Sequence, residues 1–122
     1  MDIIKTDGGV DYNIEKKGDV DVLSVNGRLD TVNYLEMQAI ILDMIEKGSR
    51  KFVIDLGGLE YISSAGIRVF FVALKKLKPL GGKLVFASLQ DAINKIFKMA
   101  GFDIMFSIFD NIEGALENIN KG

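Results

Sequence analysis

The chain has 122 residues, 48% of them hydrophobic, which is enough to bury one substantial core and predicts a single domain over residues 1–122. With 15 basic and 17 acidic residues, its net charge of −2 offers no basic surface of the kind that binds a nucleic-acid backbone directly. The absence of Cys and His excludes disulfides, Cys/His zinc sites, thiol nucleophiles and imidazole bases.

Residues 1–9 contain no long apolar run, so we expect neither a signal peptide nor a membrane span there. No other segment approaches the roughly 18 uninterrupted apolar residues that a membrane-spanning helix needs. The sequence therefore predicts a cytoplasmic protein without membrane insertion.

Two strands open the predicted fold, over residues 10–15 and 20–25. The polar connection between them, residues 16–19, has the length of a hairpin loop. After Val22 the alternation of apolar and polar residues shifts phase, which indicates either burial on both faces or a β-bulge.

A turn over residues 27–31 leads into a predicted helix, with Asp30 or Thr31 as its N-cap and Gly48 at its end. Its apolar residues recur at helical spacing and are expected to pack against the core: Leu35, Ala39, Ile40, Leu42, Met44 and Ile45.

Residues 52–56 form an almost continuous apolar run, typical of a strand buried on both faces, and Gly57 and Gly58 are expected to end it. A helix follows and stops at Pro79. Its apolar face is predicted to consist of Ile67, Phe70, Phe71, Leu74 and Leu77. Other apolar residues lie off this face and are either covered by neighbouring helices or part of an exposed protein interface: Val69, Val72 and Ala73.

The rest of the chain continues the alternation, with Gly101 ending one helix and Asp110 or Asn111 capping another. The predicted elements are a strand within residues 81–88, a helix over 90–100, a strand over 104–109 and a helix over 111–119.

Strands that alternate with helices from residue 20 onward predict βαβ units, and therefore parallel strand pairs with right-handed crossovers. The opening hairpin adds an antiparallel edge. We expect an α/β fold with a mixed sheet of four or five strands and about four helices.

Ser63 and Ser64 lie between the central strand and its helix, where either one could be the N-cap that accepts backbone N–H bonds from the first turn. A hydroxyl at this point is also exposed. A phosphate attached there would meet the positive end of the helix dipole and would add about −1.5 to −2 charges to the surface. We therefore expect phosphorylation to alter the surface and to leave the fold intact.

Several catalytic and cofactor motifs are absent. The glycine pairs at residues 8, 57 and 81 match neither a dinucleotide-binding nor a phosphate-loop pattern, so no cofactor is predicted. Ile62 stands where a nucleophile elbow needs its first glycine, and no histidine base exists for Ser64. No calcium-loop pattern groups the acidic residues, so no metal site is expected. Without these motifs no catalytic residue is predicted, and we do not expect the chain to be an enzyme.

The segment from Asp55 to Ile67 carries a family resemblance. The chain resembles the bacterial anti-sigma-factor antagonists, which are free-standing STAS domains. The family pattern is a hydrophobic strand ending in Asp-Leu, then Leu, an aromatic and an apolar residue, then Asp or Ser followed by Ser-x-Gly-Leu at the start of a helix. The matching residues are Asp55-Leu56, Leu59, Tyr61-Ile62 and Ser63-Ser64-Ala65-Gly66-Ile67. The resemblance extends over nearly the whole chain and implies a STAS-like fold.

In such proteins the serine two residues before the glycine is the phosphorylation site, which implies phosphorylation of Ser64. The loop equivalent to residues 27–30 lies beside that serine, where Asp30 matches the family's acid; alternatively, Asp30 only caps a helix. The partner-binding residues implied by the resemblance are Asp30, Asn33, Ser63, Ala65, Gly66 and Arg68.

The resemblance implies that the dephosphorylated chain binds an anti-sigma factor of the serine-kinase type and so frees a sigma factor. The kinase would phosphorylate Ser64, and a serine phosphatase would reverse the switch. The alternative is a STAS accessory subunit of a lipid-transport or stress-sensing assembly that binds its partner constitutively, which Ser63 in place of the common Asp favours slightly. A third hypothesis is a site for a small ligand such as a nucleotide or fatty acid.

Overall fold

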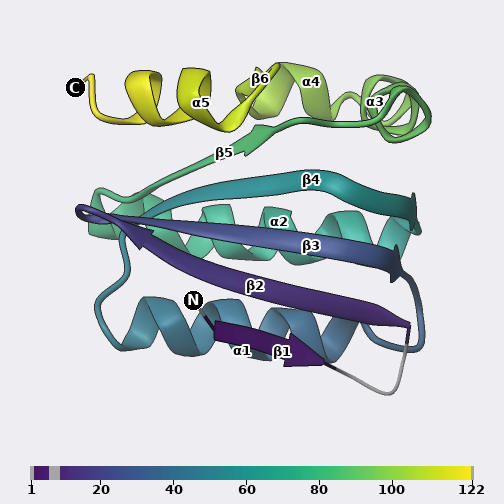
Figure 1. Cartoon of the computed structure of the whole chain (residues 1–122), viewed down its shortest axis with the longest axis horizontal. Coiled ribbons are helices and arrows are strands. Elements are labelled where there is room, and N and C mark those ends of the chain that lie inside the picture. Colours follow the sequence, from purple (N-terminus) through teal and green to yellow (C-terminus); the bar gives the residue numbers. More distant parts are fainter. Residues whose placement is uncertain (1, 6–8, 122) are drawn as a thin grey trace.

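The computed structural model describes residues 2–5 and 9–121 and shows a mixed sheet with helices packed against it (Figure 1). In this part of the chain the order of elements is β1 (Asp2–Lys5), β2 (Val10–Lys17), β3 (Val20–Leu29), α1 (Tyr34–Glu46), β4 (Lys51–Ile62), α2 (Ser64–Leu77), the 3-10 helix η1 (Lys78–Leu80), β5 (Lys83–Ala87), α3 (Asp91–Met99), α4 (Phe102–Met105), β6 (Ile108–Phe109) and α5 (Ile112–Ile119).

Among the described residues the strands form one six-stranded sheet in which each strand pairs with the next one along the chain. The β1–β2 and β2–β3 pairs are antiparallel, and the three pairs from β3 to β6 are parallel. The predicted α/β class, with its hairpin followed by parallel units, is confirmed. The sheet has one strand more than predicted, because β1 pairs with the outer side of β2.

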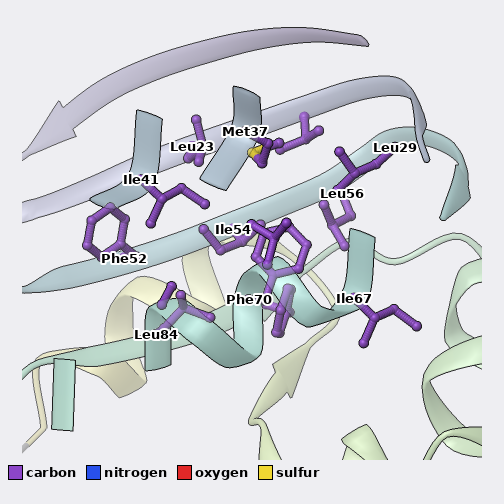
Figure 2. Close-up of a cluster of buried hydrophobic side chains, with 14 of the residues drawn as sticks. Leu23, Leu29, Met37, Ile41, Phe52, Ile54, Leu56, Ile67, Phe70 and Leu84 are labelled. Atoms are coloured by element: carbon purple, nitrogen blue, oxygen red, sulfur yellow. The ribbon is translucent and has the colours of Figure 1, made fainter. Parts of the chain in front are cut away.

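The main core lies between the sheet and helices α1, α2 and α3. Figure 2 shows how strand residues such as Ile54 and Leu56 face Phe70 of α2, with Met37 and Ile41 of α1 beside them. On the opposite face of the sheet, α5 covers a smaller cluster of Val20, Val22, Val53, Val85 and Ala87 with its residues Ala115 and Ile119. Among the described residues, no helix is both long and apolar enough to cross a membrane.

Phe86 of β5 is the centre of an aromatic cluster. Its ring makes edge-to-face contacts with Phe70 at 5.1 Å, Phe97 at 5.0 Å and Phe106 at 5.0 Å between ring centroids. Each such pair contributes about 0.5–1.5 kcal/mol beyond the area that it buries. The cluster therefore holds α3 and the segment after α4 next to α2.

Two predicted element boundaries after residue 50 are wrong. β4 continues through Gly57 and Gly58 to Ile62, because a register shift in its pairing with β3 accommodates the two glycines without ending the strand. The predicted strand over 104–109 is instead the one-turn helix α4 followed by the two-residue strand β6. Gly101 does end the preceding helical segment, with a φ of 77° that favours glycine.

The predicted details of α1 and α2 also need correction. The N-cap of α1 is Asn33, not Asp30 or Thr31, and the buried face of this helix comprises Met37, Ile41 and Ile45. Leu35 of the predicted packing face is 60% exposed, because it precedes the buried Met37 by two residues and so lies on nearly the opposite side of the helix from it. In α2, Val69 and Ala73 are buried in the main core, whereas Phe71 of the predicted core face is 37% exposed.

Candidate partner-binding site at the start of α2

The site lies where the parallel strands β3 and β4 end at the same edge of the sheet, at the right of Figure 1. The β3–α1 loop follows one strand and the start of α2 follows the other. The backbone N–H of Ser63 donates to the carbonyl oxygen of Leu29 at 2.9 Å, and this bond joins the two segments. Side chains that are 30 residues apart in the chain therefore share one surface.

Ser63, and not Ser64, is the N-cap of α2. Its backbone is extended, with φ −88° and ψ 170°, and its Oγ accepts the N–H of Gly66 at 3.1 Å. Ser64 is the first residue of the helix, and its side chain is exposed. The adjacent serines thus differ in surroundings, since Ser63 is half-buried and satisfies a backbone donor that would otherwise be unpaired.

Gly66 lets α2 approach the β3–α1 loop closely. A Cβ atom at this position would lie 2.9 Å from Cγ1 of Ile62, closer than real Cβ contacts, and 3.0 Å from both Cγ and the carbonyl oxygen of Leu29, which is tighter than most of them. Gly66 is itself buried, while its neighbour Ala65 is half-buried. Of this pair, Gly66 therefore sets the position of the helix and Ala65 adds to the accessible surface.

Asp30 and Asn33 shape the loop beside the serines. The Asn33 side chain is only 2% exposed; its Oδ1 accepts the Asp30 N–H at 2.9 Å, and its Nδ2 donates to the Arg28 carbonyl at 2.8 Å. Asp30 is half-buried, and its Oδ1 accepts the N–H of Val32 at 3.0 Å. Asn33 thus holds the loop from inside, whereas Asp30 retains accessible surface.

An apolar groove of about 760 Å³ begins at the serines and runs between α2 and the α3–α4 segment. Its lining residues are Tyr61, Ile62, Ser63, Ser64, Ile67, Arg68, Phe71, Ile96, Met99, Ala100, Phe102 and Met105. Arg68 is the one charged residue in this lining, and it is exposed. At the rim, the Arg28 guanidinium stacks over the Tyr61 ring, 4.4 Å from its centroid.

The structure therefore places all six residues predicted to bind a partner in the β3–α1 loop or the first turns of α2, with Asn33 and Gly66 buried and the other four at least partly accessible. The apolar side of the groove was not predicted from the sequence, where Phe71 was assigned to the core and no role was given to Met99 or Met105. Helical spacing alone did not reveal these residues. Two methionines on either side of the helix-ending Gly101 were the available signal.

Comparisons with known proteins agree with this architecture. The family model of the STAS domain matches residues 11–115. The Bordetella bronchiseptica protein BtrV, whose name assigns it provisionally to the anti-sigma factor antagonists, is 33% identical over 94 residues, covering 77% of this chain and 81% of BtrV.

Solved structures share the fold. An anti-sigma factor antagonist from Mycobacterium paratuberculosis superposes with a TM-score of 0.85 at 21% identity, covering 97% of this chain and 100% of its own. The phosphorylated form of the Bacillus cell fate determinant SpoIIAA gives a TM-score of 0.71 at 17% identity, covering 89% of this chain and 99% of its own. Together with the match over residues 11–115, these findings establish that the chain belongs to the STAS domain family.

Proposed function

We propose that this chain is an anti-sigma-factor antagonist, which binds a serine-kinase anti-sigma factor through the surface around Ser64 and is released when Ser64 is phosphorylated. The observation that carries the proposal is the division between the two serines: Ser63 caps α2, and Ser64 is exposed at its first residue. The name of BtrV and the existence of a phosphorylated SpoIIAA structure support it.

A phosphate on Ser64 would change binding and spare the fold. At the first residue of a helix it would face unpaired backbone N–H groups and the positive end of the dipole, so the folded chain tolerates the charge. At the centre of a protein interface, about −1.5 to −2 added charges would have to lose their water, and any nearby acidic group of the partner would repel them. Phosphorylation would therefore weaken the complex without unfolding the chain.

The wider cycle follows from this step. Capture of the anti-sigma factor by the dephosphorylated chain would free a sigma factor, and a serine phosphatase would restore the binding form. Any effect on transcription would be indirect, because the net charge of −2 gives the chain no electrostatic attraction to DNA or RNA. We place this activity in the cytoplasm, where a sigma factor acts.

The direct test uses each purified anti-sigma factor encoded by the source organism, incubated with this chain and ATP and followed by mass spectrometry. We expect one of them to bind the chain and to add a single phosphate at Ser64. Ser64→Ala should bind and remain unmodified, and Ser63→Ala should still accept the phosphate. Modification at another residue, or binding to none of these proteins, would contradict the proposal.

A second candidate is a STAS accessory subunit that binds its partner constitutively. The observation in its favour is Ser63 at the position where many switching members of the family have Asp. Ser64→Asp separates the two functions in a pull-down with the partner. Loss of binding supports the switch, whereas retained binding supports the accessory subunit.

A further inference from the structure

The groove beside Ser64 has the composition of a protein-docking surface. Exposed apolar side chains line it, with exposed fractions of 37% for Phe71, 88% for Met99 and 49% for Met105. Solvent exposure of large apolar side chains that share one groove is unfavourable unless something covers them. Methionine is flexible and polarizable, so such a surface adapts to the side chains of a partner.

Arg68 gives this apolar surface one positive charge. It is exposed, lies in the groove lining, and has no ion-pair partner among the described residues, where the pairs are Lys16–Asp21, Lys17–Glu15, Lys47–Asp43 and Lys51–Asp19. No acidic residue lines the groove. The surface is therefore complementary to an apolar segment that carries a carboxylate.

Arg68 also lies four residues after Ser64 on α2, so the two side chains are on the same face of the helix. Both line the groove. A phosphoserine at position 64 would place strong hydrogen-bond acceptors within reach of the guanidinium, which pairs well with phosphate.

We propose that the groove between α2 and the α3–α4 segment receives apolar side chains of the anti-sigma factor, with a partner carboxylate on Arg68, and that a phosphate on Ser64 takes Arg68 away from that carboxylate. This inference rests on the proposed function and adds the residue that connects phosphorylation to release. Repulsion then acts together with the loss of an attractive contact.

The groove favours a protein over a small molecule because Met99 and Met105 in its lining are 88% and 49% exposed, so this side of the groove is open to solvent. A small-ligand site usually covers most of its ligand within a cavity. Binding of an acyl chain in the groove would be distinguished by thermal stabilisation with a fatty acid.

The first experiment measures the dissociation constant of the anti-sigma factor that binds the wild type, with near-isosteric variants. We expect Met99→Gln with Met105→Gln, and separately Arg68→Gln, to weaken binding about tenfold or more. The matched controls are Leu80→Gln, a 46% exposed apolar residue of η1, which follows the C-terminal end of α2, and Lys75→Gln, an exposed cation on α2. Both controls should bind like the wild type.

If the double methionine variant and Arg68→Gln both have the dissociation constant of the wild type, this inference is wrong and the proposed function still stands. Failure of the wild type to bind any anti-sigma factor would instead refute the proposed function. The same variants are heated with and without dodecanoate, to test for acyl-chain binding. If dodecanoate stabilises the wild type but not the Met99→Gln, Met105→Gln variant, and both bind the anti-sigma factor equally, the groove binds an acyl chain and the docking proposal is wrong.

The second experiment tests the link to phosphate without any kinase, by installing phosphoserine at position 64 genetically and titrating its ³¹P signal. We expect the second pKa of the phosphate, ordinarily about 6, to be lower in the otherwise wild-type chain than in Arg68→Gln, since the guanidinium stabilises the dianion. Lys75→Gln controls for the general loss of one positive charge. Equal pKa values with and without Arg68 would exclude the competition for this side chain.

Discussion

The two adjacent serines before α2 differ in what their hydroxyl groups do. Ser63 Oγ accepts the Gly66 N–H, so it stabilises the start of the helix, whereas Ser64 is exposed one residue later. A modification of Ser64 therefore leaves the cap intact. This separation lets one position of the chain change its charge while the neighbouring one preserves the fold.

Substitution of each serine should reveal the difference in stability. We expect Ser63→Ala to lower the free energy of unfolding by about 1 kcal/mol, because the helix loses its capping hydrogen bond. Ser64→Ala should change it by less than about 0.5 kcal/mol, as is usual for exposed positions. Urea denaturation of both variants measures this. Equal effects of the two substitutions would contradict the assignment of the cap.

Gly66→Ala should destabilise the chain although alanine is the better helix former by about 1 kcal/mol. The added methyl group would overlap Ile62 and Leu29, and overpacking of this kind costs about 1–3 kcal/mol. Thermal unfolding followed by circular dichroism gives the sign. An increase in melting temperature would show that the α2 start can move away from the loop.

At the scale of elements, the β3–α1 loop and the start of α2 depend on each other through Ser63 and Leu29, and Asn33 holds the loop in shape. We expect Asn33→Ala to lower the free energy of unfolding by about 1–3 kcal/mol, since the Arg28 carbonyl and the Asp30 N–H both lose the buried side chain that pairs with them. Thr31→Ala, an exposed change in the same loop, is the control and should be nearly neutral. A neutral Asn33→Ala in denaturant titration would show that the loop does not need this clamp.

The elements were predictable from sequence to the extent that local signals decided them. The apolar run over 52–56 and the helix stop at Gly101 are local signals, and both are found in the structure. Of the two predicted caps of the last helix, Asp110 and Asn111, the structure has Asn111. The full length of β4 was not predictable in this way, because it depends on pairing with β3 across Gly57 and Gly58.

In the last third of the chain, a predicted strand is shorter than expected. Ile104 and Met105 have strand-like apolar character, yet they belong to α4, and Ile104 is 87% exposed. Apolar periodicity assumes that apolar residues are covered by the same chain, and exposed apolar residues such as Ile104 break that assumption. Phe71 of the groove was assigned to the core for the same reason, whereas Met99 and Met105 were given no role.

At the scale of the whole molecule, one buried group links stability to pH. The Tyr12 side chain is fully buried, and its hydroxyl has no hydrogen-bond partner among the described residues. Burial first, and repulsion by Glu36 second, raise the pKa of this hydroxyl. The folded chain therefore holds the proton more tightly than the unfolded chain does.

This shift predicts loss of stability in alkali. The contribution of Tyr12 is complete below the ordinary tyrosine pKa of about 10 and decreases as the pH rises above it, because only the unfolded chain ionises readily. Tyr12→Phe should keep its stability at high pH and should not be less stable at neutral pH, since an unpaired buried hydroxyl is removed. Urea denaturation between neutral and alkaline pH measures this, with Tyr61→Phe, an exposed tyrosine, as control. The same alkaline loss in both variants would contradict the role of Tyr12.

A negative charge added at position 64 should not change the stability of the fold. We expect Ser64→Asp to leave the melting temperature and the far-ultraviolet circular dichroism spectrum unchanged, because an acidic group at the first residue of a helix is favourable. Loss of partner binding in a variant that unfolds at a lower temperature would instead point to damage of the fold.

The order of the strands has a consequence for how the chain is made. Since every strand pairs with its predecessor in sequence, the sheet grows at one edge only and never has to insert a strand between two others. Each parallel pair therefore closes a loop of only one helical crossover, as between Val20 and Lys51, and no pairing has to close the longer loop that skipping a strand would need. During synthesis, β3 and β4 can pair before α3 leaves the ribosome, so the surface that presents Ser64 is organised well ahead of the groove that completes it.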